Sequence, residues 1–356
     1  ADGDALTYSA KQTSGAALPA WLNFNATTRA FTGTPQSGDV GSLTIRLSVS
    51  DGRGGSAYDD FTIRVQGQTV PAPDTLQGTI SQSMVMQTGQ TYTIAGHVTV
   101  DAGVTLTVEA GAVIKASQYQ GLTVNGTLSV QGTAANPVTF TSAATNPAAG
   151  NWSGITVNAG STVVIEHAVI EYATAGVHFS GSGGRVEHST IRYNTHGVRV
   201  DGVTGTASAA PRILNNTITD NTSYGVHAWG AYDARYDPRP VVTGNTLTRN
   251  GYNGNGNYYA YWFADPSNVL LDATGNWWGT TEVSAIAASI YDYTDRPTYS
   301  PVVNFGGYLD ASGGNPVGGA TVLGSLDDTR TPLTAGAAYT VLGSVLVPTG
   351  KTLTIQ

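Results

Sequence analysis

Residues 176–202 read GVHFSGSGGRVEHSTIRYNTHGVRVDG and contain one short pattern twice. Val177-His178-Phe179 and Val198-Arg199-Val200 each place a polar side chain between two apolar ones, and their first residues are 21 apart. Because successive side chains of a strand point to opposite faces, each triplet predicts a short strand with its apolar residues inward. Glycines and other turn formers lie between them. The stretch therefore predicts one such strand per turn of a coil.

The pattern continues on both sides of this stretch. Four further triplets have the same character: Val98-Thr99-Val100, Leu122-Thr123-Val124, Ile155-Thr156-Val157 and Val226-His227-Ala228. Repeats of about 20–30 residues built from short strands and turns are typical of a parallel β-helix, whose coils bury their inner faces by stacking. The sequence therefore predicts a parallel β-helix over residues 78–310.

Asparagine recurs at two corners of the predicted coil. The two columns are Asn216, Asn245 and Asn276, and Asn194, Asn221 and Asn250. Asparagine tolerates left-handed backbone and can form hydrogen bonds to the coil above or below. We interpret both columns as structural ladders rather than ligand sites.

Composition supports an all-β protein and excludes several functional classes. Only 11% of the residues are charged, with three lysines and five glutamates, so the usual helix-surface residues are scarce. The net charge of −8 and the absence of a basic block disfavour a nucleic-acid partner. The chain has no cysteine, which excludes disulfides and thiolate chemistry. No apolar run approaches the ~18 residues of a transmembrane helix.

Segments outside residues 78–310 have other patterns. Residues 1–66 alternate apolar and polar residues between Gly-rich turns, which predicts a β-sandwich. Residues 67–77 contain Pro71-Ala72-Pro73 and are predicted to be a stiff linker. Residues 281–310 are expected to cap the β-helix through one short helix, Thr281 to Tyr291, with Thr281 as its N-cap.

The end of the chain repeats an earlier segment. Residues 339–356 match residues 92–109 in register at an offset of 247, including the tyrosine, two glycines and Thr-Leu-Thr. We therefore expect the first strands of a second β-helix over residues 320–356, as in a piece of a longer tandem protein. The alternative is a polymer in which open edges are completed by strand addition between copies.

Two resemblances add to this interpretation. The segments DGDALTYSA, LPAWLNFNATTRAFTGTP, GDVG and SVSDGRGGSAYDDFTIRV resemble the dystroglycan-type cadherin-like (Ig-like) domains of bacterial surface proteins. GHVTVDAGVTLTVEAGAVIKA, the NTI-type coils and GNWWGTTE resemble right-handed parallel β-helices of bacterial surface and secreted proteins. The resemblance implies a bacterial cell-surface or extracellular location.

The cadherin-like resemblance also implies Ca²⁺, which such domains bind through acidic loops. The best-matched positions here are Asp2, Asp4, Asp51 and Asp59, although the family's first acid would precede Ala1. Carboxylates and backbone carbonyls are the oxygen ligands that Ca²⁺ prefers. The alternative is that these residues are solvated turn carboxylates.

One outward column of the β-helix holds the candidate binding residues. His178, Arg199 and His227 occupy the middle of successive triplets, and Tyr259 follows one coil later. Polysaccharide lyases on this fold use such residues, so Arg199, His227, Arg235 and Tyr236 are a candidate catalytic set. The alternatives are sugar binding without chemistry, or a plain polar face. Glu166, Glu187 and Glu171 lie on neighbouring strand faces without a predicted cleft, which disfavours a glycosidase.

The sequence as a whole favours a non-catalytic structural segment of a large extracellular bacterial protein, such as an adhesin-like stalk, matrix, surface-layer or filament component. Its expected partners are other copies or neighbouring repeats of the same protein, and surface polysaccharide. The rival interpretation is a carbohydrate-binding protein or lyase that uses the face with His178, Arg199 and His227.

Overall fold

The computed structural model describes residues 5–35, 39, 41–65, 70–317, 321–325 and 340–346. The chain divides into two compact units, residues 1–69 and 70–356. Among the described residues, no helix is long and apolar enough to cross a membrane.

The first unit contains two small antiparallel sheets. Strands β1 (Thr7–Gln12), β4 (Gly41–Ser50) and β5 (Ser56–Val65) form one sheet, and β2 (Leu22–Asn25) pairs with β3 (Ala30–Gly33) in the other. The rings of Phe31 on β3 and Phe61 on β5 meet edge to face, with centroids 5.5 Å apart. Leu22 and Ile45 are buried. These contacts join the two sheets as in the predicted Ig-like sandwich.

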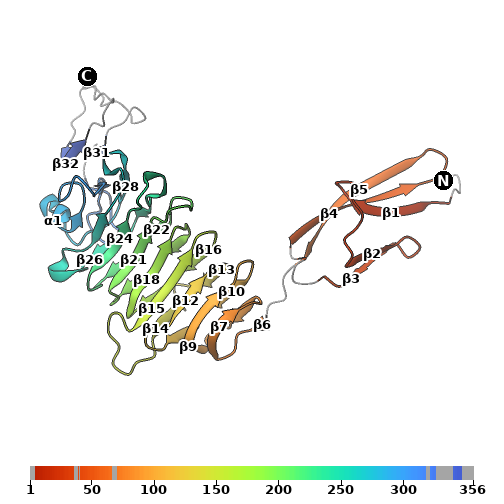
Figure 1. The fold of residues 1–356 in the computed structure, drawn as a ribbon, viewed down its shortest axis with the longest axis horizontal. Coiled ribbons are helices and arrows are strands. Elements are labelled where there is room, and N and C mark those ends of the chain that lie inside the picture. Colours follow the sequence, from red (N-terminus) through yellow and green to blue (C-terminus); the bar gives the residue numbers. More distant parts are fainter. Residues whose placement is uncertain are drawn as a thin grey trace, which may run out of the picture. The chain divides into compact units, whose positions relative to one another are not determined.

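The second unit is a parallel β-helix with three faces (Figure 1). Face one is a ten-stranded sheet of β6 (Val70–Pro71), β8 (Met84–Met86), β10 (Thr105–Glu109), β13 (Thr127–Gln131), β16 (Thr162–Glu166), β19 (Arg185–Glu187), β22 (Arg212–Leu214), β25 (Val241–Thr243), β28 (Leu270–Asp272) and β30 (Val302–Asn304). Face two contains the first half of β9 (Thr91–Val100), β11 (Val113–Ala116), β14 (Val138–Ser142), β17 (Ala168–Glu171), β20 (Thr190–Arg192), β23 (Thr217–Thr219) and β26 (Thr246–Thr248).

Face three carries the predicted triplets. It contains the second half of β9, β12 (Gly121–Val124), β15 (Trp152–Asn158), β18 (Ala173–Ser180), β21 (His196–Asp201), β24 (Tyr224–Trp229), β27 (Tyr258–Tyr261) and β29 (Ile290–Tyr291), while β7 (Thr75–Ile80) pairs along both halves of β9. Because β9 takes part in both, faces two and three are one continuous sheet.

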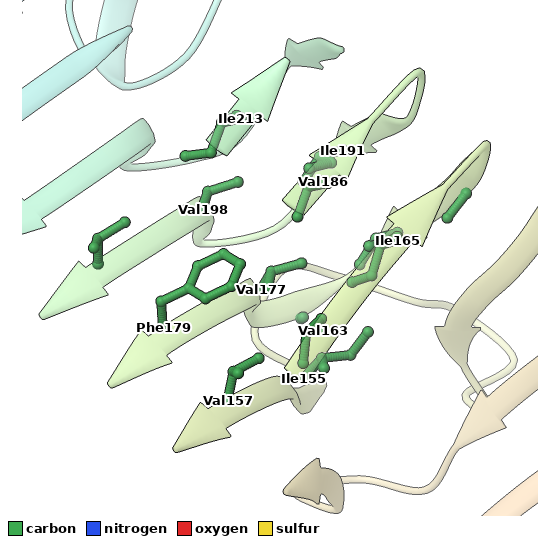
Figure 2. Close-up of a cluster of buried hydrophobic side chains, with 14 of the residues drawn as sticks. Ile155, Val157, Val163, Ile165, Val177, Phe179, Val186, Ile191, Val198 and Ile213 are labelled. Atoms are coloured by element: carbon green, nitrogen blue, oxygen red, sulfur yellow. The ribbon is translucent and has the colours of Figure 1, made fainter. Parts of the chain in front are cut away.

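The core of the β-helix runs along the inside of all three faces. Figure 2 shows side chains from faces one and three meeting there, with Val163 and Ile165 of β16 near Val177 and Phe179 of β18. Every apolar residue of the six triplets is at most 2% exposed. The predicted alternation is therefore confirmed, and each coil buries its inner face against its neighbours.

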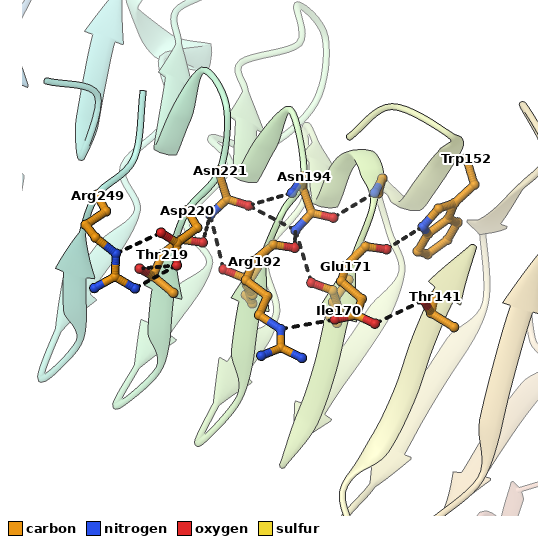
Figure 3. A network of polar contacts seen from close by, with 12 residues as sticks. Thr141, Trp152, Ile170, Glu171, Arg192, Asn194, Thr219, Asp220, Asn221 and Arg249 are labelled. Carbon is orange, nitrogen blue, oxygen red and sulfur yellow. Dashed lines mark hydrogen bonds and ion pairs between the residues drawn. The ribbon is translucent and has the colours of Figure 1, made fainter. Parts of the chain in front are cut away.

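The asparagine columns lie at the two corners that flank face two and are buried. At one corner Asn194 N–H donates to Asn221 Oδ1 and Asn221 N–H to Asn250 Oδ1; the other corner repeats this from Asn216 to Asn245 to Asn276. Each Nδ2 also donates to backbone carbonyls, such as that of Ile170 for Asn194 (Figure 3). The ladders therefore pair the polar backbone groups that the corners would otherwise bury without partners.

One detail of the ladder prediction is wrong. The left-handed backbone belongs to the residue before the ladder position, with φ of 56° at Tyr193, 55° at Asp220 and 55° at Arg249. The preceding residue makes the turn, and the asparagine can then direct its carboxamide inward along the stack.

The predicted linker over residues 67–77 is also wrong from residue 70 onward, and its first three residues lie outside the described ones. Val70–Pro71 forms β6, which pairs with β8, and Thr75 already belongs to β7. Ala72 is buried in the core and its N–H donates to the carbonyl of Val85. Proline is tolerated because β6 is the last strand of its sheet, where one N–H is not needed for pairing.

The capping helix is shorter than predicted. Helix α1 spans Val283–Ala288, and its N-cap is Glu282 rather than Thr281, without a side-chain capping bond. Residues Ile290–Tyr291 leave the helix as β29 because they pair with β27. Ile286 is fully buried in the core, so the helix does contribute to closing it. Among the described residues of the second unit, short 3-10 helices also occur, namely η2 (Ala234–Tyr236), η3 (Tyr252–Gly254) and η4 (Pro266–Asn268).

Strand β31 (Thr321–Ser325) pairs in parallel with β32 (Thr340–Leu346), within the segment where the sequence predicts the first strands of a second β-helix. Gly324 faces Val345 across a shift in register, just as Gly78 faces Val98 where β7 pairs with β9. The rest of the predicted repeat, with residues 326–339 and 347–356, lies outside the described residues.

Candidate functional site

The outer surface of face three changes character along the stack. Strand register places His178, Arg199, His227, Tyr259 and Tyr291 in one column. In earlier coils the same column holds Thr99, Thr123 and Thr156. The four predicted binding residues are thus neighbours, but their surroundings differ from those expected of an open polar face.

Arg199 and His178 are both bound to Asp201. Arg199 Nε lies 2.9 Å and 3.0 Å from the two carboxylate oxygens, and His178 Nε2 lies 2.9 Å from Oδ2. Burial of Asp201 raises its pKa, but the hydrogen bonds from His178 and Arg199 outweigh burial and leave the pKa below its usual value. Asp201 therefore neutralises much of the positive charge that the column was expected to present.

His227 is buried rather than exposed, with only 5% of its surface accessible. The rings of Tyr224, Trp229 and Tyr259 lie within 5.2–5.7 Å of it, centroid to centroid. Neither ring nitrogen has a hydrogen-bond partner among the described residues. Burial, followed by the nearby His196 and Arg199, lowers the pKa of His227 to about 3. His227 is therefore neutral at pH 7 and buried, and it does not lie on the open polar face that the sequence predicted.

Tyr259 is held in a stack of three tyrosines. Its ring centroid lies 4.3 Å from that of Tyr224 and 4.6 Å from that of Tyr291, with nearly parallel planes. Burial raises the pKa of Tyr259 to about 12, so the phenol keeps its proton at neutral pH. The stack packs the aromatic surface of three adjacent coils and covers His227.

Arg235 and Tyr236 form part of a separately anchored loop. Arg235 is bound to Asp233, with Nη2 2.6 Å from Oδ2, and its guanidinium lies 5.4 Å from the Tyr236 ring centroid. The buried Asp237 fixes the loop, because its carboxylate accepts from the N–H groups of Ala231 and Ala264. Neither Arg235 nor Tyr236 is among the described residues that line the adjacent groove.

That groove lies two residues further along the strands. The column Ser180, Asp201, Trp229 and Tyr261 runs beside the predicted one. A cavity of about 540 Å³ opens there, bordered by Arg199, Asp201, Trp229, Tyr232, Tyr261 and Trp262 together with the loop after β21. Sequence reasoning missed Asp201 and Trp229, although the alternation of the triplets, extended by two residues, points outward at both.

The glutamates of faces one and two are engaged in ion pairs. Arg185 Nη2 lies 2.5 Å from a Glu166 oxygen and Nη1 lies 3.3 Å from one of Glu187. Arg192 Nε lies 3.1 Å from Glu171, which also accepts from Thr141 (Figure 3). These pairs neutralise stacked like charges across adjacent strands. Among the described residues, these three glutamates are therefore paired with arginines, whereas an inverting glycosidase uses two carboxyl groups that act on substrate and water.

The acidic residues of the first unit remain a calcium prediction. Asp51 Oδ1 accepts from the N–H groups of Arg53 and Gly55, Asp59 lies exposed on β5, and Asp60 pairs with Arg46. Asp2 and Asp4 lie outside the described residues. Within the described ranges, no three acidic or histidine side chains converge as a metal site would require.

We expect added Ca²⁺ to raise the melting temperature of the first unit, and a chelator to reverse this, since a ligand that binds only the folded state stabilises it. Scanning calorimetry of the whole chain measures the effect. Asp51→Asn is the informative variant because its carboxamide oxygen can still accept from Arg53 and Gly55 while its charge is lost. If the melting temperature does not change with Ca²⁺, the calcium prediction is wrong and these residues are turn carboxylates.

Comparison with known families matches this architecture. Residues 1–66 match the family model described as putative Ig domain, and residues 78–227 match the one described as pectate-lyase like beta helix domain. The two matches follow one another along the chain, the putative Ig domain first and the pectate-lyase-like β-helix domain second. This confirms the two domain types expected from the sequence. Neither the curated proteins nor the solved structures gave a match. Both domain types are typical of extracellular proteins and fit a surface protein with a structural or binding role.

Proposed function

We propose that the chain is a non-catalytic structural segment of a large extracellular bacterial surface protein, of the stalk, matrix, surface-layer or filament type. The observation that carries the proposal is that candidate catalytic and binding side chains make contacts within the scaffold itself. Arg199 binds Asp201, His227 is sealed under aromatic rings, and Tyr259 is stacked between tyrosines. A general base needs access to a substrate proton and a suitable pKa.

The architecture supports a load-bearing role. Strand pairing is continuous through the stack from β6 to β30, and buried asparagine ladders connect successive coils at two corners. The pairing of β31 with β32 repeats that of β7 with β9, which supports tandem β-helices with other copies or neighbouring repeats as partners. A solenoid of this kind is extendable because each repeat contacts only its neighbours.

Incubation with polysaccharides tests the non-catalytic part. We expect wild-type protein, with Ca²⁺ present, to release no more reducing ends or unsaturated uronate from polygalacturonate and neutral polysaccharides than the Arg199→Ala variant does. The reason is that Arg199 is ion-paired with Asp201 and His227 is buried. Cleavage by the wild type that Arg199→Ala loses would establish the lyase alternative and contradict the proposal.

A further inference from the structure

The groove beside Trp229 is lined by three successive coils. Its lining comes from the end of β21 and the loop after it, and from the end of β24 and the segment that follows. The next coil contributes Tyr261 and Trp262. Gly230 permits this close approach, because a Cβ there would lie 2.2 Å from the carbonyl oxygen of Trp262. The groove is thus part of the ordered stack.

An aromatic column ends at this groove. Trp262 stacks on Tyr299 with centroids 5.3 Å apart and planes 5° apart, and on Trp229 at 6.3 Å and 12°. Among the described residues, the ring contacts of Trp229 are with His227 of its own strand and with Tyr261 and Trp262 of the next coil. On the preceding coil its register partner is Asp201, which has no ring. On the side of β21, therefore, no aromatic ring of the described residues packs against Trp229, and this side of the tryptophan borders the groove.

The charges at the groove are balanced. Arg199 and Asp201 are the oppositely charged residues of the lining, and Arg199 Nη2 lies 2.9 Å from Asp201 Oδ2. The Arg199 side chain is still 34% exposed, so it retains donors for a ligand. A ligand here meets donors, an acceptor and a flat apolar surface without a net formal charge from this pair. That combination disfavours a polyanion, which would need an unpaired cation.

We propose that the groove binds a neutral saccharide chain, with one sugar ring lying against Trp229. A pyranose ring is flat, presents C–H groups on its faces and carries hydroxyls around its edge. Its face can continue the aromatic column, while edge hydroxyls reach the Arg199–Asp201 pair. Tyr232, which is 88% exposed at the groove, provides a second ring. This site is additional to the proposed structural role, which does not depend on it.

Titration with oligosaccharides tests the proposal in the whole chain, with tryptophan fluorescence as the readout. The probes are neutral hexasaccharides of glucose, mannose, xylose, galactose and N-acetylglucosamine, with hexagalacturonate as the acidic counterpart. We expect at least one neutral probe to bind with a dissociation constant of about 1 mM or lower, and hexagalacturonate to bind more weakly. We expect Trp229→Ala and Tyr232→Ala each to weaken that binding, by about tenfold for Trp229→Ala.

Two further variants sharpen the test. Tyr252→Ala removes a similarly exposed tyrosine that is not among the lining residues and should leave affinity unchanged. Asp201→Asn should free the charge of Arg199 and shift preference toward hexagalacturonate. Because Tyr232 is exposed, its variant stays informative if Trp229→Ala fails to fold. The proposal is overturned if no neutral probe binds, if hexagalacturonate binds best to the wild type, or if Tyr232→Ala and Trp229→Ala both bind normally.

Discussion

Replacing Asn221 by alanine is expected to lower the free energy of unfolding by about 3–5 kcal/mol. Its Oδ1 accepts from the N–H and Nδ2 of Asn194, and its Nδ2 donates to the carbonyl oxygens of Ile191 and Thr219 and to Asn250 Oδ1. Alanine leaves several of these buried groups without a partner, at about 1–3 kcal/mol each. Urea unfolding monitored by circular dichroism measures the loss.

Two variants separate the ladder from the coil that carries it. Thr217→Ala alters an exposed residue on β23, in the same coil, and should change stability by no more than about 0.5 kcal/mol. Asn221→Asp keeps the acceptor but buries a charge and loses both donors, so it should cost at least as much as alanine. A loss below about 1 kcal/mol for Asn221→Ala would show that the ladder does not hold the coils together.

Acid is expected to destabilise the β-helix through His196 and His227. Burial is the main cause that lowers the pKa of His227 to about 3 and that of His196 to about 4, from an ordinary value of 6.5. Below pH 6.5 the two histidines bind protons in the unfolded chain but stay unprotonated in the native state. Their contribution to the free energy of unfolding is therefore fully present above that pH and is lost as the pH falls toward the native pKa values. The expected loss is about 2 kcal/mol per histidine at about pH 5.

Phenylalanine provides the control, because it keeps a ring and cannot bind a proton. Unfolding of His227→Phe measured at neutral pH and at about pH 5 should show roughly half of the histidine-dependent loss. Its stability at neutral pH should be equal or higher, since the buried nitrogens of His227 lack partners among the described residues. If the double variant His196→Phe, His227→Phe keeps the wild-type pH dependence, other groups are responsible.

Much of the solenoid was predictable because its signals are local and repeat. Alternation along a strand is a property of the backbone, so Val177 and Phe179 could be placed inward without knowing their neighbours. Each pattern is weak in a single coil, but its recurrence in successive coils makes the prediction firm. The asparagines that occupy the same corners of successive coils are an example. The same repetition predicted the first strands of a second β-helix, in the segment where β31 pairs with β32.

The candidate site was predicted less well because its environment comes from several coils. Alternation correctly indicates that His227 points away from the core of the coil. It does not indicate that Tyr224, Trp229 and Tyr259 close over the ring. Likewise, Asp201 could be counted as an outward carboxylate, but its two bonds to His178 and Arg199 depend on side-chain reach across adjacent strands.

The sequence by itself determined the β-helix, its inward residues, the ladder positions and the Ig-like first domain, because each follows from local periodicity or an extended motif. The tertiary structure alone decided that Pro71 lies in an edge strand, that His227 is sealed, and that the open groove lies beside Trp229. Those outcomes depend on how side chains from different coils pack against one another. That packing is set only when the coils stack.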